Sequence, residues 1–140
     1  RVMGDLKDAQ CVSLTTDAWS SSTMEPFLSL TVHYITPTWN LQSFCLRTIY
    51  LPQSHTGENI AAMLRNVLRE YNIQLENCVS ITTDSGSNMV KACKELPMVR
   101  IPCFGHILHN SICTSTKQDK VTETLKGVRS VVTTFSHSGK

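Results

Sequence analysis

Two aspartates that end nearly identical hexapeptides are the strongest candidates for chemistry in this sequence. Asp17 ends VSLTTD (residues 12–17), and Asp84 ends VSITTD (residues 79–84). The β-branched residues before each aspartate predict a strand. If the two strands are parallel neighbours, both carboxylates emerge together at the carboxyl ends of the sheet, where α/β proteins bind ligands. Carboxylates so close repel each other, and a divalent cation relieves the repulsion.

Mg²⁺ or Mn²⁺ is the cation that this pair predicts, because hard ions prefer oxygen ligands and keep positions open for water and phosphate. Phosphodiester cleavage uses such a site, with one ion activating the attacking hydroxyl and the other stabilising the leaving oxygen. Asp17 would bridge the ions and Asp84 would hold one of them. A second interpretation stays open, because an aspartate followed by Ser85 and Gly86 is also typical of a simple turn or helix cap.

A second group of possible ligands is Cys103, His106, His109 and Cys113. The last three share one face if the segment is helical, and Cys and neutral His are zinc ligands. The spacing is not that of a known finger, so buried thiols and hydrogen-bonded histidines are favoured and we expect no zinc in this segment. His106 follows a predicted strand closely and could approach a phosphate.

Three other residues are candidates for contacts with DNA. Trp19 stands two residues after Asp17, although an aromatic residue beside a buried strand is more often part of the core. Lys91 and Lys94 follow Asp84 closely and are the best placed of the basic residues for phosphate contacts.

The elements that must position these residues alternate between strands and helices. Residues 12–16, 28–35 and 41–50 have the composition and alternation of strands and predict an antiparallel meander. Thr56 predicts the cap of a helix whose apolar residues recur on one face as far as Tyr71.

The second half of the chain predicts crossover units. We expect strands at residues 79–83 and 98–101, a short helix at 88–95, and helices at 104–113 and from 119 onward. The order is β-β-β-α-β-α-β-α. Right-handed crossovers then place the strand at 79–83 beside the first strand and parallel to it. The prediction is an α/β, RNase H-like fold, with a mixed five-stranded sheet and helices on both faces.

Composition limits the class of protein. The 140 residues, 41% of them hydrophobic, suit one globular domain, and we find neither a membrane-length apolar stretch nor a signal peptide. We therefore expect a soluble intracellular protein. The six cysteines are scattered and are expected to be free thiols, while the formal charge of +2 is too small to indicate a nucleic-acid partner by itself. The usual nucleotide-binding and hydrolase signatures are missing, so no small-molecule substrate is expected.

Several longer motifs resemble one family, the hAT DNA transposases and their host-derived relatives with BED-type zinc fingers. The matching segments follow one another in family order: LTTDAWSS (14–21), FLSLTVHY (27–34), HTGENI (55–60), TTDSGSNMVKAC (82–93) and IPCFGH (101–106). The resemblance implies an RNase H-like catalytic domain in which Asp17 and Asp84 are the first two catalytic acids. It also implies that Cys103 and His106 form the family's C-x-x-H motif near the active site.

The resemblance further implies what this chain alone should do. In the family a third acid, a glutamate, lies beyond a helical insertion, and none of the glutamates here stands in such a context. We therefore expect residues 1–140 to be the amino-terminal part of the catalytic domain and to be inactive alone. DNA, a second copy of the protein held through other regions, and the nucleus are the partners and location that the family implies. The alternative is a domesticated relative that binds DNA or protein in transcriptional regulation without catalysis.

Overall fold

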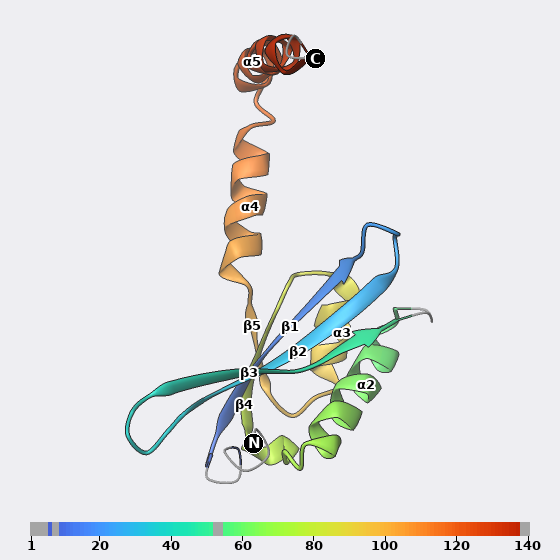
Figure 1. Cartoon of the computed structure of the whole chain (residues 1–140), viewed down its shortest axis with the longest axis vertical. Coiled ribbons are helices and arrows are strands. Elements are labelled where there is room, and N and C mark those ends of the chain that lie inside the picture. Colours follow the sequence, from blue (N-terminus) through green and yellow to red (C-terminus); the bar gives the residue numbers. More distant parts are fainter. Residues whose placement is uncertain (1–5, 7–8, 52–54, 138–140) are drawn as a thin grey trace. The chain divides into compact units, whose positions relative to one another are not determined.

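The computed structural model describes residue 6, residues 9–51 and residues 55–137 (Figure 1). The chain divides into two compact units, Arg1–Cys103 and Phe104–Lys140, and each is treated by itself. The first unit contains the sheet and the buried core. No helix in the described residues is both long enough and apolar enough to cross a membrane.

A five-stranded mixed sheet forms the first unit, in the spatial order β3-β2-β1-β4-β5. The antiparallel part is the predicted meander of β1, β2 and β3, and β4 and β5 add to it as parallel strands. Their bounds are β1 Val12–Ser20, β2 Pro26–Ile35, β3 Leu41–Tyr50, β4 Cys78–Thr83 and β5 Val99–Pro102. The predicted mixed α/β sheet, with its antiparallel meander and with β4 parallel to β1 and beside it, is therefore confirmed.

Strand β1 is longer than the sequence predicts. It continues four residues beyond Thr16 because β2 pairs with it along its whole second half, from Asp17 opposite Ser29 to Ser20 opposite Pro26. On its other side β1 is paired with β4 only as far as Thr15. Asp17 therefore lies inside β1 and not after it, at the level where the parallel pairing ends.

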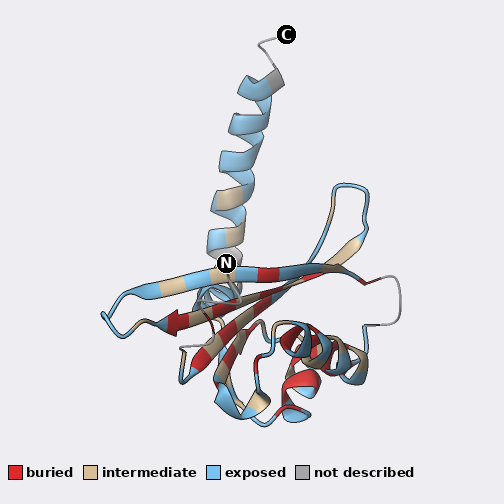
Figure 2. Cartoon of the chain, turned by 60° about the horizontal axis from the view of Figure 1, so that its bottom comes forward, coloured by how far each residue is buried: buried red, intermediate tan, exposed pale blue. Residues whose placement is uncertain are grey.

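Two helices cover one face of the sheet (Figure 2). Helix α2 (Gly57–Glu70) begins where predicted, since the Thr56 hydroxyl accepts a hydrogen bond from the Asn59 amide. Helix α3 (Ser87–Lys94) follows β4. A short 3-10 helix, Leu75–Asn77, comes directly before β4, and the sequence did not predict it.

Alternate residues of the strands point into the core between the sheet and these helices. Strands β1, β2 and β4 and the two helices contribute its largest fully buried apolar side chains, namely Leu14, Leu28, Leu30, Val32, Ile60, Leu64, Leu68, Ile81 and Met89. Burying one such side chain contributes about 1.5–3 kcal/mol. The same alternation turns Ser13, Thr15 and Asp17 to the opposite face, which is where a carboxylate can stay hydrated.

The second unit consists of α4 (Phe104–Ser115) and α5 (Asp119–His137). Both helices were predicted. The apolar residues of α4, which helical periodicity in the sequence predicts on an inward face, are exposed in the structure: Phe104, Ile107, Leu108 and Ile112. Periodicity marks a face that can be buried, whereas burial needs further elements, and two helices form no core of their own.

Candidate metal centre

The two copies of the repeated hexapeptide lie side by side in the sheet. The parallel pairing sets Ser13 opposite Ser80, and their hydroxyls are 3.1 Å apart, with the Ser80 hydroxyl donating. The two serines are 67 residues apart in sequence, which is also the separation of Asp17 and Asp84. The pairing thus brings corresponding residues of the repeat to the same level. The sequence prediction that the aspartates are neighbours is correct.

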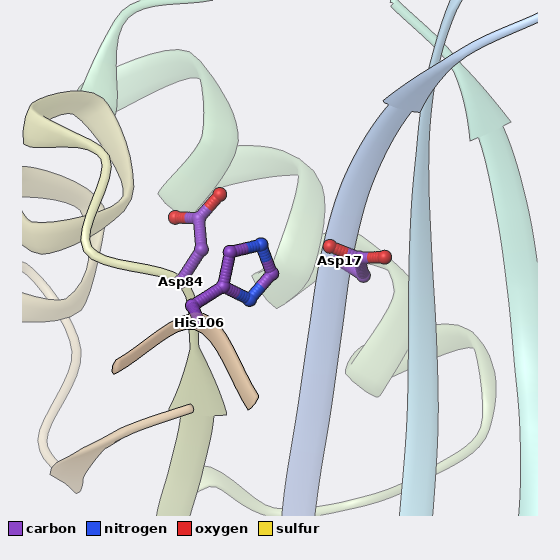
Figure 3. A group of neighbouring side chains, drawn as sticks. All are labelled: Asp17, Asp84 and His106. Carbon is purple, nitrogen blue, oxygen red and sulfur yellow. The ribbon is translucent and has the colours of Figure 1, made fainter. Parts of the chain in front are cut away.

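A carboxylate oxygen of Asp17 lies within 4.8 Å of one of Asp84 (Figure 3). Asp17 is exposed on β1 and Asp84 is half-buried just after β4. Two full negative charges no more than 4.8 Å apart repel by at least about 0.9 kcal/mol in water, and by at least roughly 3.5 kcal/mol at an effective dielectric constant of 20. The arrangement therefore stores a repulsion that a bound cation would remove.

The backbone around Asp17 is fixed by the hairpin with β2. The Thr16 hydroxyl donates to the Ser29 carbonyl oxygen at 2.7 Å, and the Ser29 hydroxyl lies 3.5 Å from the Asp17 carbonyl oxygen. Since Thr16 is buried and Asp17 is exposed, alternation along β1 directs the carboxylate away from the core.

Asp84 sits in a tight turn between β4 and α3. Its Oδ1 accepts a hydrogen bond of 2.9 Å from the Gly86 amide, which confirms the turn interpretation of this segment. A Cβ on Gly86 would lie 3.1 Å from Asp84 Oδ1 and 2.9 Å from Asn88 Oδ1, so glycine allows the close approach. The turn and the metal interpretations are compatible, because a carboxylate has further lone pairs to offer a cation.

Arg100 on β5 is a residue near Asp84 that the sequence did not single out. Its guanidinium donates to the Asp84 carbonyl oxygen at 2.6 Å and to Thr83 Oγ1 at 2.9 Å. A lone arginine between Val99 and Ile101 gives no periodic signal. Only the parallel pairing of β4 with β5 brings its side chain to the turn.

The C-x-x-H residues fall at the boundary of the two units. The Cys103 amide donates to the Thr83 carbonyl oxygen at 2.8 Å, which anchors Cys103 beside the residue that precedes Asp84. His106, also labelled in Figure 3, comes from the first turn of α4. Three residues span at most about 10 Å, so the covalent chain keeps His106 within that reach of Cys103. A role for His106 in the site stays a prediction.

Trp19 is not a core residue. It is 42% exposed and stacks on Phe27, its partner across the hairpin, with the ring centroids 5.8 Å apart. Phe27 in turn contacts Tyr50 with centroids 5.6 Å apart, so three aromatic rings cross three neighbouring strands. A pocket of about 270 Å³ opens beside them, lined by Trp19, Phe27, His55, Asn88 and neighbouring residues. Both Trp19 and Asn88 lie close in sequence to one of the two aspartates.

The two candidate lysines differ in their surroundings. Lys91 forms an ion pair with Glu58 on α2, and this contact raises the pKa of Lys91 and lowers the pKa of Glu58. Lys94 is exposed in the last turn of α3. Lys91 therefore links α2 to α3, and Lys94 is the more accessible cation.

The other possible ligands do not assemble. Cys113 Sγ and His109 Nε2 on α4 are 3.4 Å apart, and in the described part of the chain no third His, Cys, Asp or Glu completes a metal-binding group with them. The described glutamates likewise add no third acid to the pair formed by Asp17 and Asp84.

Comparison with known proteins agrees with this architecture. A family model described as the ZBED1 RNase-like domain matches residues 15–100, which include both aspartates and all five strands in part or whole up to Arg100. The chain belongs to the ZBED1 RNase-like domain family. The membership fits the RNase H-like fold predicted from the sequence.

Relatives of this ZBED1 RNase-like chain include transposases. It is 30% identical to "Transposable element Hobo transposase" of Drosophila melanogaster, over 74% of this chain and 16% of that protein. It is 26% identical to "Putative AC transposase" of Zea mays, over 62% of this chain and 11% of that protein. It is also 26% identical to "Putative transcriptional regulator tpeD" of Talaromyces stipitatus, over 72% of this chain and 13% of that protein. The predicted relationship to hAT transposases is thus confirmed, and the chain spans 11 to 16% of the length of these relatives.

Proposed function

We propose that this chain supplies two of the metal-binding acids of a DNA transposase catalytic core, with Asp17 and Asp84 sharing a divalent cation. The observation that carries the proposal is the pairing of the repeated hexapeptides, which leaves two carboxylate oxygens within 4.8 Å of one another at the carboxyl end of β4. The relatives named as transposases support the same assignment.

The donor set suits Mg²⁺ or Mn²⁺. Both groups are carboxylates, and hard cations of this size prefer such oxygens and retain water in the positions that the protein leaves open. Asp17 is exposed, so a phosphate could enter beside it. When bound, the cation would polarise the scissile phosphodiester and lower the pKa of an attacking hydroxyl or water.

The residues of the chain itself would hold and orient this site. The β1–β2 hairpin fixes the direction of Asp17, and the turn at Gly86 fixes the carboxylate of Asp84. By the family resemblance, strand cleavage also needs a glutamate that residues 1–140 do not supply. The chain alone should therefore bind the cation without cutting DNA.

Trp19 and Lys94 are the proposed DNA contacts, Trp19 on β1 two residues after Asp17 and Lys94 in the last turn of α3. The exposed Trp19 ring is held in place by Phe27, which leaves its outer surface available to stack on a base. Base stacking of this kind contributes about 1–3 kcal/mol per base. Lys94 would reach a phosphate, and Lys91 would do so only by leaving Glu58.

The test of the metal site is a thermal shift with Mn²⁺. A cation at about five times its Kd should stabilise the folded chain by about 1 kcal/mol, because it binds the native state alone. The double variant Asp17→Asn with Asp84→Asn should lose this stabilisation. The matched control, Glu76→Gln with Glu123→Gln, removes the same charge from two exposed acids and should retain it. Equal shifts in the double variant and the control would reject the site.

A second function is favoured by the fungal relative, whose name describes a transcriptional regulator. In that case the fold would bind DNA without cutting it. Strand cleavage by the natural protein that contains this chain, assayed in Mg²⁺ on duplex DNA, separates the two functions. Cleavage that Asp17→Asn abolishes supports the transposase, whereas DNA binding that is unchanged by Asp17→Asn, without cleavage, supports the regulator.

A further inference from the structure

Arg100 makes several hydrogen bonds to polar groups at the end of β4, outside the apolar core. It is half-buried on β5, and its guanidinium reaches across to the end of β4 instead of pointing to solvent. Nε donates to Thr83 Oγ1 at 2.9 Å, while Nη2 donates to the Asp84 carbonyl oxygen at 2.6 Å and lies 3.4 Å from Ser85 Oγ. One side chain thus contacts three consecutive residues, Thr83 at the end of β4 and Asp84 and Ser85 in the turn.

The Asp84 carbonyl oxygen is held from two sides. It accepts from Arg100 Nη2 and also from Thr83 Oγ1, which donates to it at 2.8 Å. A carbonyl oxygen has two lone pairs, so both are used and this oxygen has none to offer a cation. Only the carboxylate of Asp84 is then suited to bind metal.

The other end of the residue is fixed as well. Asp84 Oδ1 accepts from the Gly86 amide at 2.9 Å, which sets the rotation of the carboxylate relative to the turn. That hydrogen bond depends on the conformation of the Asp84 peptide, because the donor lies only two residues further on. Loss of the hold on the Asp84 carbonyl should therefore alter the direction in which the carboxylate points.

We propose that Arg100 is a positioning residue, which holds the Asp84 peptide so that its carboxylate faces Asp17 in the geometry for sharing a divalent cation. This inference rests on the proposed function for the cation itself. The planar guanidinium suits the task because its Nε and Nη2 donors have a fixed separation that matches Thr83 Oγ1 and the Asp84 carbonyl. Its positive charge also lies on the same turn as the acid that it positions.

Two variants and one control test the role. Arg100→Gln removes both the paired Nε and Nη2 donors and the positive charge. Arg100→Lys retains the charge but replaces the two fixed donors with a single ammonium group. The control is Arg65→Gln, since the Arg65 guanidinium also donates to a backbone carbonyl, that of Glu95, at the end of α3. All three changes remove one arginine contact to the backbone, and only the changes at Arg100 affect the Asp84 turn.

The first measurement needs no metal. Hydrogen exchange of the Gly86 amide, followed by NMR, reports the hydrogen bond to Asp84 Oδ1 directly. Arg100→Gln should accelerate that exchange by about fivefold or more, the equivalent of one lost hydrogen bond. Arg65→Gln should leave it unchanged, and Arg100→Lys should lie between. Exchange at Gly86 that is the same in Arg100→Gln and wild type would overturn the proposal.

The second measurement is the Kd for Mn²⁺. Loss of a group that orients a metal ligand costs about 10- to 100-fold in affinity, and Arg100→Gln should weaken binding by that factor while Arg65→Gln does not. Unchanged Mn²⁺ affinity in Arg100→Gln would also overturn the positioning role. If the wild-type chain binds no Mn²⁺ but Gly86 exchange still rises in Arg100→Gln, the cation site fails while Arg100 is confirmed as the residue that holds the Asp84 turn.

Discussion

Replacing Asp17 with asparagine should have opposite effects on stability with and without a divalent cation. Asparagine keeps the shape of the side chain and removes its charge. At the limiting separation of 4.8 Å the repulsion with Asp84 is about 0.9 kcal/mol in water and roughly 3.5 kcal/mol at an effective dielectric constant of 20. Because Asp17 is exposed, the lower limit applies, and Asp17→Asn should stabilise the chain by about 1 kcal/mol in the presence of a chelator.

Adding Mn²⁺ should reverse the order. At ten times its Kd, a cation that binds only the folded wild type contributes about 1.4 kcal/mol, which exceeds the gain from removing the repulsion. Urea unfolding followed by circular dichroism measures both states. In 1 M KCl the stability gain of Asp17→Asn over wild type in chelator should become smaller, because the Debye length falls to about 3 Å.

Glu76→Gln is the control for the loss of one negative charge, since Glu76 is exposed and does not belong to the pair. Glu76→Gln should change the free energy of unfolding little, both in chelator and in Mn²⁺. A repulsive pair that shares a cation is refuted if Asp17→Asn is no more stable than wild type in chelator, or if Mn²⁺ stabilises Asp17→Asn as much as it stabilises wild type.

Three further outcomes follow from the structure. Gly57→Ala should destabilise the fold by about 1–3 kcal/mol in urea unfolding, because the added Cβ would lie 2.9 Å from the Ala92 backbone nitrogen. Gly127→Ala is the control: a Cβ there meets nothing within 4 Å, and the change should stabilise α5 slightly. Burial raises the pKa of Cys78 from 9.0 to about 11, so the thiol ionises first in the unfolded chain. Stability should therefore fall by roughly 2–3 kcal/mol as pH rises through that interval, a loss absent from Cys78→Ala. Trp19→Ala should weaken binding of a fluorescent single-stranded oligonucleotide by about 1–3 kcal/mol in an anisotropy titration, and Trp39→Ala, in the exposed turn between β2 and β3, should not.

The sequence was sufficient to predict the sheet and the aspartate pair, because both depend on local pattern. Alternation and β-branched runs marked the strands, and the repeated hexapeptide carried its own register: corresponding residues of the two copies became lateral neighbours. The cap at Thr56 was equally local. Such features are set by contacts within a few residues or between identical patterns.

The features that sequence missed depend on which element comes to lie beside which. The extension of β1 needs β2 as a partner, and once β1 is known to continue, Trp19 falls two residues after Asp17 on the same exposed face. Arg100 is a single cation whose partners are a hydroxyl and a backbone carbonyl on another strand. A side-chain hydrogen bond to a distant backbone carbonyl leaves no periodic pattern in the sequence. The pattern of α4 likewise shows which face is apolar but not whether another element covers it.

The most direct test of the shared cation is a titration of Mn²⁺ followed by electron paramagnetic resonance of the free ion. The wild-type chain should remove Mn²⁺ from solution at a saturable site, and so should the control with Glu76→Gln and Glu123→Gln. Asp17→Asn and Asp84→Asn should each weaken that site, and the double variant should abolish it. Saturable binding in the double variant equal to that of wild type would contradict the assignment of Asp17 and Asp84 as the ligands.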